Sequence, residues 1–452
     1  MADIFISYAK EDRKVAEKLY DLLTGQWTVW WDDDVIDEFH REIEREIAKA
    51  GCILSLFSKS SREKATVIDE LNLGRHLNKK IIPIKLDESK PPYSFGTLSS
   101  VDMCDWQGST NHLGFKLLHK RIVNVIPPSA ALKRPNRIAN GKLPLPSLFM
   151  SVSSHETQLV PSDAVKILSI CKVPTILVSA YDLVSHREPD NLIKEIRKFR
   201  NKGGFVLIDS GNYEASRLSD KSWSAEHLKE VLKSTPHDWA FCFDNLEPSL
   251  GKNRCVKDVV DTIERDQAHT NSPVLPIVHA PKLNAGGYKL DDFPEIVRRI
   301  SEKLNPELIA VPERELGAGL IARAETVMSI RNELNKLPFY QPIHLLGTGN
   351  PWSIAVLSAA GADTFDGLEW CRFAINTESE IEAINHFHHF DLISGLSESK
   401  IGFAGEVAIH NLNYFNSFGD IMRSMSKEAF VQGVIGKKAF FKLKFGLPEL
   451  FK

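Results

Sequence analysis

The sequence has few cysteines and no long apolar run. Its six cysteines are scattered over 452 residues without any close pair, a pattern that argues against a disulfide framework and against a zinc ribbon. No stretch approaches the roughly 20 consecutive apolar residues that a transmembrane helix needs. The chain also starts without the basic and apolar regions of a secretory signal peptide. These absences predict a cytoplasmic protein with no membrane partner.

A large excess of charge of either sign is also missing. The formal net charge is -3, with 56 lysines and arginines against 59 aspartates and glutamates, so the chain as a whole does not resemble a polyanion-binding protein. One segment near the end, Gly436-Lys-Lys-Ala-Phe-Phe-Lys-Leu-Lys444, is both basic and aromatic. A surface that follows a nucleic-acid backbone has this composition, and a solvated terminal helix or strand explains it equally well.

The length of the chain indicates more than one domain. A chain of 452 residues is too long for a single ordinary core, because domains usually have about 100 to 200 residues. Residues 127–146 contain several prolines and show no sustained period, as a semi-rigid linker does. The sequence therefore predicts a first domain at residues 1–126, a linker at 127–146, and a second domain at 147–452 that ends in a helical extension.

In the first domain, short apolar runs alternate with amphipathic stretches, which is typical of a parallel sheet covered on both faces. We expect strands at 4–8, 27–31, 52–57, 80–86 and near Val101, and helices at 12–23, 38–49, 64–77 and 111–126. Ligands of such sheets bind beyond the carboxyl ends of the strands. We therefore expect Ser7, Tyr8, Trp31 and the acidic loop at 32–37 to face a site.

Five segments of this domain carry a family resemblance: Phe5-Ile-Ser-Tyr-Ala-Lys-Glu-Asp12, Val29-Trp-Trp-Asp32, Ser55-Leu-Phe-Ser58, Asp69-Glu-Leu71 and Ile82-Pro-Ile84. In this order and spacing they resemble a Toll/interleukin-1 receptor (TIR) domain, which has a flavodoxin-like parallel sheet. Prokaryotic TIR domains are often enzymes that cleave NAD+. The resemblance implies the same fold here and, as a candidate activity, release of nicotinamide from NAD+.

The resemblance also implies roles for individual residues. The catalytic glutamate of these enzymes occupies the place of Glu70, where it stabilises the ribosyl cation as nicotinamide leaves. Phe39 is expected to stack on the nicotinamide, and Tyr8, Lys10 and Trp31 to line the NAD+ site. This chain has Thr66 where the family usually has a tryptophan. A TIR domain that serves only as a homotypic adaptor is the alternative, and in both cases the resemblance implies a homo-oligomer.

The second domain shows the recurring strand and helix pattern of a TIM (β/α)8 barrel. Strand-like runs lie at 175–178, 204–208, 239–243, 274–278, 308–311, 343–346 and 364–365, with helical stretches such as 190–199, 225–232 and 293–304 between them. The active site of such a barrel lies at the carboxyl ends of its strands. This rule collects Asp209, Asp244, His279 and Asp366 in one place, and hydrogen bonds that close the barrel are the alternative role for them.

Eight segments of this domain carry a second resemblance: Leu148-Phe-Met-Ser-Val152, Val178-Ser-Ala-Tyr-Asp-Leu183, Ile208-Asp-Ser-Gly-Asn-Tyr213, Phe243-Asp244, Ile277-Val-His-Ala280, Leu346-Gly-Thr-Gly-Asn-Pro351, Phe365-Asp366 and Ile409-His-Asn-Leu412. In order, they resemble the landmarks of tRNA-guanine transglycosylases. That family includes relatives that place 7-deazaguanine bases in tRNA or DNA. The resemblance covers nearly the whole domain.

This resemblance assigns the carboxylates at the strand ends. Asp366 is expected to attack the ribose C1′ and hold a covalent intermediate, and Asp209 to act as general acid or base. Asp244 is expected to accept hydrogen bonds from the purine edge. His279 stands where the family usually has a glutamine that reads the base. The expected nucleobase-binding set is completed by Tyr213, Gly347 and Gly349.

No bound metal is expected. The zinc site of the family needs three closely spaced cysteines and a histidine, and only His410 is in place, because Cys371 alone does not supply the rest. His386, His388 and His389 are close in sequence, and surface histidines of a helix explain them better than a ligand set.

Three whole-protein functions follow from these resemblances. The first is a TIR-type NAD+ glycohydrolase that acts as a bacterial antiphage-defence effector and is regulated by a barrel that senses a nucleobase or a nucleic acid. The second is a transglycosylase that exchanges guanine for a 7-deazaguanine in tRNA or DNA, with a regulatory TIR domain. The third is a non-catalytic, ligand-binding adaptor. NAD+ is the expected substrate of the first.

Overall fold

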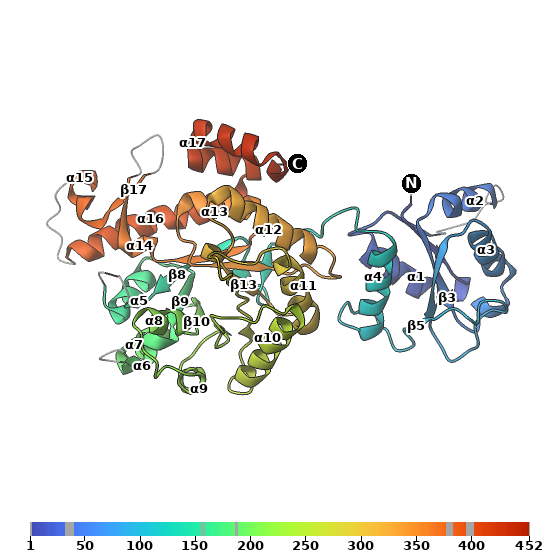
Figure 1. The fold of residues 1–452 in the computed structure, drawn as a ribbon, viewed down its shortest axis with the longest axis horizontal. Helices are drawn as coiled ribbons and strands as arrows, with labels where there is room; N and C mark the ends of the chain where they lie inside the picture. Colours follow the sequence, from blue (N-terminus) through green and yellow to red (C-terminus); the bar gives the residue numbers. More distant parts are fainter. Residues whose placement is uncertain are drawn as a thin grey trace. The chain divides into compact units, whose positions relative to one another are not determined.

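The computed structural model describes residues 2–31, 40–154, 157, 159–185, 189–376, 383–394 and 402–451. The chain divides into two compact units (Figure 1), which are Met1–Lys133 with Asn335–Tyr340, and Arg134–Leu334 with Gln341–Lys452. Within these described ranges, no helix has the length and apolar character needed to cross a membrane.

The N-terminal unit is built on a five-stranded parallel sheet with the order β2-β1-β3-β4-β5. Its strands are β1 (Ile4–Ser7), β2 (Val29–Trp30), β3 (Cys52–Phe57), β4 (Lys80–Lys85) and β5 (Val101–Asp102). Its helical segments are η1 (Lys10–Asp12), α1 (Arg13–Leu23), α2 (His40–Lys49), η2 (Ser61–Glu63), α3 (Ala65–His76) and α4 (Leu113–Val125). The predicted flavodoxin-like α/β class is confirmed.

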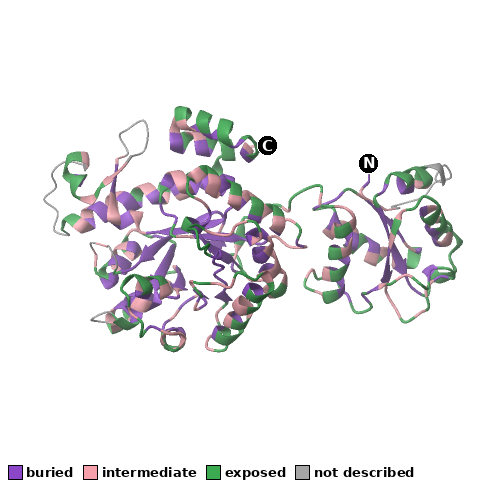
Figure 2. Cartoon of the chain, viewed as in Figure 1, coloured by how far each residue is buried: buried purple, intermediate pink, exposed green. Residues whose placement is uncertain are grey.

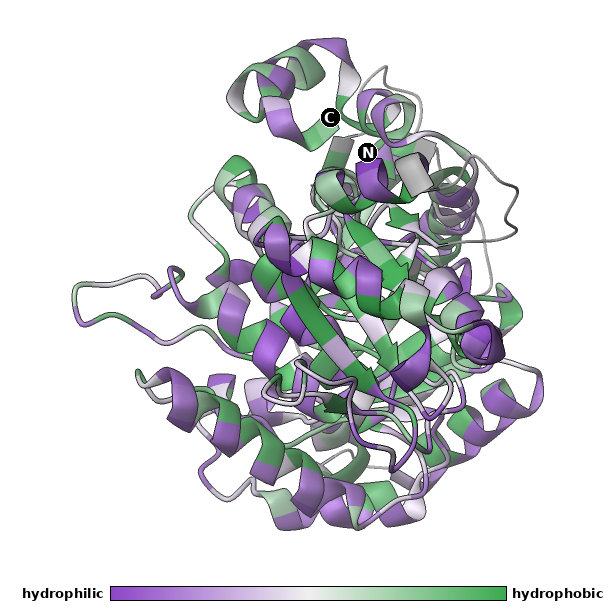
Figure 3. Cartoon of the chain, turned by 90° about the vertical axis from the view of Figure 1, so that its right-hand side faces the viewer, coloured by the Kyte–Doolittle hydropathy of each residue, from purple (hydrophilic) through white to green (hydrophobic). Residues whose placement is uncertain are grey.

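Successive side chains of each strand point to opposite faces of this sheet, and both faces are buried. Ile4 and Ile6 pack into a core cluster with side chains of α1 and α4, while Phe5 between them packs into a second cluster with side chains of α2 and α3. Successive side chains of a strand point to opposite faces, so a strand covered on both sides is apolar throughout. Figure 1 shows the two helix layers on either side of the sheet, and strands are mainly green in Figure 3.

The second unit is an eight-stranded parallel barrel. Its strands are β8 (Ser147–Val152), β9 (Thr175–Ser179), β10 (Phe205–Asp209), β11 (Trp239–Phe241), β12 (Val274–Leu275), β13 (Ile309–Pro312), β14 (Ile343–Leu346) and β15 (Thr364–Gly367). They are hydrogen-bonded in the order β12-β11-β10-β9-β8-β15-β14-β13. A parallel bridge between Ile277 and Ala310 joins the two ends of this order. The predicted TIM-barrel fold is confirmed.

Helices surround the barrel, as Figure 2 shows by the purple strands inside a mixed pink and green exterior. They are α5 (Pro161–Ile170), α6 (Ala180–Ser185), α7 (Pro189–Asn201), α8 (Asn212–Arg217), α9 (Ala225–Ser234), α10 (Lys252–Gln267), α11 (Phe293–Leu304), the 3-10 turn η3 (Glu313–Glu315), α12 (Leu320–Leu334) and α13 (Pro351–Ala359). In the connections between consecutive strands these helices return the chain to the amino end of the next strand, as parallel pairing requires.

The barrel interior is apolar in its middle and at its amino end. Phe149, Leu207 and Phe241 point inward from three strands and belong to one core cluster. Leu143 joins the same cluster from a hairpin of β6 (Arg137–Ile138) and β7 (Leu143–Pro144), which precedes the first barrel strand. Residues 134–146, the larger part of the segment expected as a linker, therefore lie within the barrel unit and contribute a fully buried side chain to its core.

The chain ends in a hairpin and a helical extension. These elements are α14 (Glu369–Arg372), β16 (Phe373–Asn376), β17 (Ala383–His386), η4 (Phe387–His389), α15 (Phe390–Ser394), α16 (Phe403–Ser424), α17 (Lys427–Gly446) and η5 (Pro448–Phe451). The fully buried Asn411 of α16 donates to the carbonyls of Trp370 and Phe373 and accepts from the amide of Ile375. One side chain thus fixes the segment that follows β15.

A buried ionic cluster holds the amino ends of two barrel strands. Asp363, directly before β15, is fully buried, and its carboxylate lies 2.7 Å from Nε of Arg134 and 2.6 Å from Nη2 of Arg331. It also accepts a hydrogen bond of 2.8 Å from the amide of Ile343, the first residue of β14. Removing one partner of such a cluster leaves buried charges without compensation.

We expect Asp363→Ala to lower the free energy of unfolding by about 3 to 5 kcal/mol, because two guanidinium groups lose their common carboxylate. Urea unfolding of the full chain measures this change. The control is Asp163→Ala, which removes an exposed carboxylate paired with Lys166 and should cost below about 1 kcal/mol. Equal losses for the two variants would contradict a structural role for the buried cluster.

Candidate functional site

Polar side chains begin where the inward-facing apolar positions of the barrel strands end. Two residues after Phe149, Leu207 and Ile277 of the core cluster stand Ser151, Asp209 and His279. Side chains of a strand repeat their direction every second residue, so these three also point inward, one layer closer to the carboxyl ends. Asp366 in β15 and Asp244 after β11 join them around one cavity of about 260 Å³.

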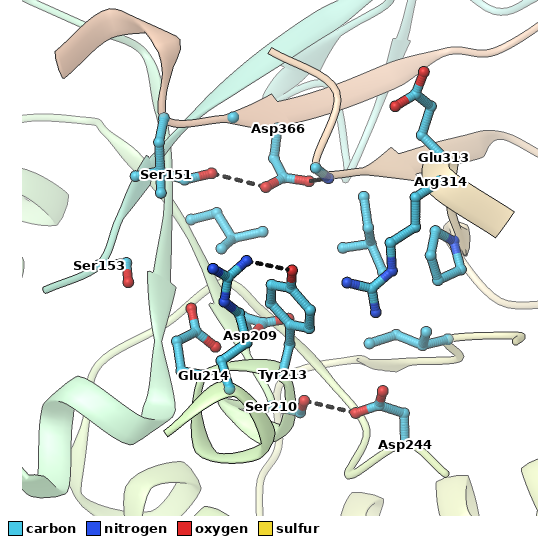
Figure 4. Close-up of a pocket in the computed structure, with 18 of the residues that line it drawn as sticks. Ser151, Ser153, Asp209, Ser210, Tyr213, Glu214, Asp244, Glu313, Arg314 and Asp366 are labelled. Carbon is cyan, nitrogen blue, oxygen red and sulfur yellow. Dashed lines mark hydrogen bonds between the residues drawn. The ribbon is translucent and has the colours of Figure 1, made fainter. Parts of the chain in front are cut away.

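The structure brings most of the predicted barrel residues together. The cavity is lined by Asp209, Tyr213, Asp244, His279, Gly347 and Asp366, among others. In the close-up of Figure 4, Asp366 lies on one side of the cavity, with Asp209, Ser210 and Asp244 across from it. Gly349 is not part of the lining. A side chain there would collide with the carboxylate of Glu369, which does line the cavity.

Asp366 is held by residues of β8 and β14 and by the residue that directly follows β14. Ser151 Oγ donates to Asp366 Oδ2 at 2.8 Å, the amide of Gly347 donates to Oδ1 at 2.9 Å, and His344 Nε2 lies 3.2 Å from Oδ1. Gly347 has a φ of 73°, a left-handed conformation that glycine adopts without steric cost. The carboxylate is therefore fixed in orientation and only 7% exposed. A nucleophile or a stabiliser of a cation needs such a fixed position.

Asp209 and Glu214 form a second, proton-holding region. Burial, with Glu214, Asp244 and Asp366 nearby, raises the pKa of Asp209 well above its usual value. Burial also raises the pKa of Glu214 to about 7, with Asp182 adding to the effect. Glu214 Oε2 is buried and has no hydrogen-bond partner in the described part of the chain. At neutral pH this region therefore keeps protons that a general acid would deliver.

A buried ionic triad forms another part of the cavity wall. His279 Nε2 lies 2.7 Å from Asp244 Oδ2, and His279 Nδ1 lies 2.8 Å from Glu315 Oε1. Burial alone would lower the pKa of His279, but the two carboxylates raise it to about 9. Burial alone would raise the pKa of Asp244, but the hydrogen bonds from His279 and Ser210 bring it below its usual value. His279 is therefore an imidazolium that donates from both ring nitrogens.

Two arginines flank the aromatic ring at the cavity. The guanidinium carbon of Arg314 lies 4.1 Å from the centroid of Tyr213, and that of Arg217 lies 5.7 Å from it. Arg217 also donates to the hydroxyl of Tyr213 at 3.1 Å. Arg314 is exposed, whereas its neighbours Glu313 and Glu315 on η3 are buried. Glu313 accepts a hydrogen bond from Arg323, and Glu315 accepts one from His279. Tyr213 is thus presented as a stacking surface with positive charge beside it.

Several residues that line this cavity, or that contact its lining from behind, were not predicted from the sequence. Glu214, Arg314, Glu315 and Glu369 lie in turns or short helices, where no strand period indicates their direction. Burial also raises the pKa of Glu369 to about 7. His344 was the one residue with a readable signal, since it is a histidine inside an apolar strand.

Histidines and cysteines do not form a metal centre in the described residues. No group of three or more His, Cys, Asp or Glu side chains there has the arrangement of a metal site. His410 Nε2 lies 2.7 Å from the carbonyl oxygen of Ile375, and Cys371 Sγ lies 3.4 Å from that of Leu368. The rings of His386, His388 and His389 lie 4.4 to 5.8 Å apart.

The predicted NAD+-binding residues of the first unit lie on more than one layer. The rings of Tyr8 and Trp31 are 5.9 Å apart, and both pack against the core on the side of α1 and α4. Lys10 is exposed on η1, two residues after Tyr8. Phe39 and the loop at 32–37 lie outside the described residues. Trp31 also contacts Tyr20, which gives it a packing role in addition to any ligand contact.

Glu70 lies on the second turn of α3, on the opposite face of the sheet from Trp31. It is half-buried, beside the buried stripe of Val67, Leu71 and Gly74 that faces the sheet. Because α3 follows the carboxyl end of β3 after a short connection, its first turns lie near the edge where ligands of parallel sheets bind. The position suits a carboxylate that reaches a ligand at this edge.

A second carboxylate near this edge was not predicted. Asp12 accepts a hydrogen bond of 2.6 Å from Ser58 Oγ, which joins η1 to the end of β3. Burial raises the pKa of Asp12, and the charges of Asp87 and Glu11 act in the same direction. The hydrogen bond links two of the loops that border the carboxyl edge of the sheet.

The geometry defines the chain as a parallel α/β module followed by a barrel with a carboxylate-rich cavity. Residues 4–118 match the family model of the TIR domain. The barrel region is similar to a tRNA-guanine(15) transglycosylase of Methanopyrus kandleri, at 24% identity over 52% of this chain and 50% of that protein. It is also similar to the enzymes of the same name from Picrophilus torridus (25% identity, 38% of this chain, 26% of that one) and Methanobrevibacter smithii (24%, 44% and 31%).

These similarities establish the two parts of the chain. It carries a TIR domain and a transglycosylase-like domain, as the sequence motifs predicted. The chain spans half or less of the length of the curated relatives that it matches.

The buried triad of Asp244, His279 and Glu315 makes a contribution to folding stability that depends on pH. The raised pKa of about 9 for folded His279, against about 6.5 in an unfolded chain, contributes stability that is fully present below pH 6.5 and is lost as the pH rises through 9. We expect this contribution to be on the order of 3 kcal/mol. His279→Gln should lack it, so the unfolding free energies of the variant and of the native chain should converge between about pH 7 and 10. Parallel pH curves for the two proteins would contradict a protonated His279.

Proposed function

We propose that this protein is a TIR-type NAD+ glycohydrolase whose output is set by the transglycosylase-like barrel. The observation that carries this proposal is the TIR match over residues 4–118 together with a half-buried Glu70 near the carboxyl edge of the sheet. In the proposed reaction Glu70 faces the ribose attached to nicotinamide. Its negative charge stabilises the oxocarbenium ion that forms as the glycosidic bond breaks.

The remaining parts of the proposal follow from the same assignment. NAD+ is the substrate, Tyr8, Lys10, Trp31 and Phe39 contribute to its site, and copies of the TIR domain assemble into an active homo-oligomer. The barrel binds a nucleobase or a nucleic acid and thereby controls NAD+ consumption, as an antiphage-defence effector requires. No metal takes part. We also retain domain boundaries at 1–126, 127–146 and 147–452 as a proposal.

Glu70→Gln should lower the rate of nicotinamide release by about 100-fold or more, because the amide has a similar shape and no charge. The rate is measured by chromatography after purified full-length protein is incubated with NAD+, alone and with single-stranded DNA, tRNA or a deazaguanine base. Asp69→Asn is the matched control, since it removes an exposed carboxylate one residue away on the same helix. Its rate should stay near that of the native chain.

Two results would reject the assignment. If Glu70→Gln kept the native rate, Glu70 would not be the catalytic group. If no addition produced nicotinamide release from the native protein, the adaptor function of the TIR domain would be favoured.

A second candidate function is supported by the barrel cavity itself. Asp366 is oriented by Ser151 and Gly347, while burial holds the pKa of Asp209 well above its usual value. A carboxylate fixed by hydrogen-bond donors and a second, proton-holding carboxyl group in one cavity suit the division of roles that nucleophilic glycosyl transfer needs. The curated relatives are named tRNA-guanine(15) transglycosylases. Exchange of guanine for a deazapurine in tRNA or DNA is therefore the alternative activity.

This alternative predicts a covalent adduct between the barrel and a nucleic acid. Denaturing electrophoresis after incubation with tRNA or single-stranded DNA should show a slower band that Asp366→Asn abolishes. Asp209→Asn should slow base exchange by about 100-fold or more. The exposed Asp163→Asn should change neither. Absence of both adduct and exchange with every tested nucleic acid, in a protein that still binds a base, would leave the barrel as a sensor.

A further inference from the structure

A solvent-facing surface of α17 combines aromatic and basic side chains. The helix is interrupted at Gly436, which has a φ of 75°, so residues 437–446 form their own helical segment. We define the Lys-Phe face as the five exposed residues Lys437, Lys438, Phe441, Lys442 and Phe445. Phe441 is 74% exposed and Phe445 is 86% exposed.

Helical spacing places these five residues on one side. Lys437, Phe441 and Phe445 follow each other at intervals of four, as do Lys438 and Lys442, and such residues are neighbours on a helix surface. Phe440 and Leu443 lie on the other side and are 7% and 5% exposed. Figure 2 shows this contrast as green and purple bands on α17. The segment is therefore anchored to the protein by one apolar side and presents a different one to solvent.

In the part of the chain that the structure describes, the lysines of this face lack a charge partner. Among the described residues, no carboxylate pairs with Lys437, Lys438 or Lys442, whereas the adjacent Lys444 pairs with Glu428 at 2.7 Å. Three unpaired ammonium groups around two exposed phenyl rings match a partner that offers both negative charge and flat apolar rings. A single-stranded nucleic acid has both, since its phosphates attract lysine and its unpaired bases stack on aromatic side chains.

The geometry also fits a single strand better than a membrane. A membrane-surface helix inserts a broad apolar face into lipid, yet the apolar side of this segment, with Phe440 and Leu443, is already buried. Phe441 and Phe445 are separated by about 6 Å along the helix axis, close to twice the spacing of about 3.4 Å between bases along a strand. Each ring can therefore stack on a base of its own when the strand is stretched.

The Lys-Phe face ends at the carboxyl rim of the barrel. Gly446, the last residue of α17, packs so closely on Ile321 that a side chain there would lie 2.9 Å from Ile321 Cδ1. Ile321 is in the first turn of α12, the helix that follows the cavity-lining turn η3. A strand on this face thus reaches the side of the barrel on which the cavity opens.

We propose that the Lys-Phe face binds single-stranded nucleic acid, with Phe441 and Phe445 stacking on bases and the three lysines contacting phosphates. This inference rests on the proposed function, in which the barrel binds a nucleic acid, and it assigns the surface that contacts the strand.

The test is fluorescence anisotropy of the full chain with labelled single strands of about 12 nucleotides, as DNA and as RNA, and with duplex DNA. F441S/F445S should weaken single-strand binding by about tenfold or more. K438Q/K442Q should reduce the slope of log affinity against log salt by about 1.4 between about 50 and 200 mM salt. The control K194Q/K303Q removes two exposed lysines from α7 and α11 and should leave both quantities unchanged. A preference between DNA and RNA identifies the source of the strand.

Several results would overturn the inference. They are equal affinity of native protein and F441S/F445S, no binding of any single strand, and an equal slope for the test and control lysine pairs. Binding of anionic phosphatidylserine vesicles without oligonucleotide binding would identify a membrane surface instead. Self-association lost only in F441S/F445S, with no oligonucleotide binding, would identify a second copy as the partner. Nicotinamide release measured on the same samples tests the NAD+ proposal separately, because Glu70→Gln should leave oligonucleotide affinity unchanged.

Discussion

Repulsion between buried carboxylates is the constraint on which the barrel cavity depends. The lining of a cavity of about 260 Å³ includes Asp209, Glu214, Asp244, Asp366 and Glu369. So many negative charges are not stable together in a small volume lined by buried groups. The protein resolves the conflict locally. Asp244 is neutralised by an imidazolium, Asp366 is stabilised by hydrogen-bond donors, and burial raises the pKa values of the other three carboxyl groups. Asp209, Glu214 and Glu369 thereby retain protons more readily than solvent-exposed carboxyl groups do.

Inside the barrel, apolar layers lie toward the amino ends of the strands and polar layers toward their carboxyl ends. Moving along the strands, the interior changes from a hairpin plug with Leu143, through aromatic and aliphatic layers, to the carboxylate cavity. A buried ionic cluster around Asp363 lies at the opposite end, where it ties β14 and β15 to residue Arg134. The amino ends of the strands thus carry stabilising contacts, and the carboxyl ends retain groups that would be costly in a core.

The sequence predicted what depends on strand periodicity. Asp209, His279 and Asp366 lie in one cavity, as expected from their places at the carboxyl ends of apolar strand segments. Glu315 was not predicted, because its inward direction depends on the turn η3 and its proton-sharing partner His279 is 36 residues earlier. Gly349 was expected to bind the base, and its place behind Glu369 depends on a side chain 20 residues later. Similarly, no local pattern indicates that Trp31 and Glu70 lie on opposite faces of the first sheet.

His279 stands where the sequence resemblance implies a glutamine, and this difference changes what the cavity would offer to the proposed base. A glutamine amide presents one donor and one acceptor, whereas the imidazolium of His279 presents two donors, and both are engaged by Asp244 and Glu315. The remaining hydrogen-bonding capacity on this wall belongs to carboxylate oxygens, which accept only. We therefore expect selectivity to depend on N–H groups of the ligand that point to Asp244. A base with an acceptor at that edge would face a carboxylate that cannot donate, and it would be rejected through an unpaired buried group.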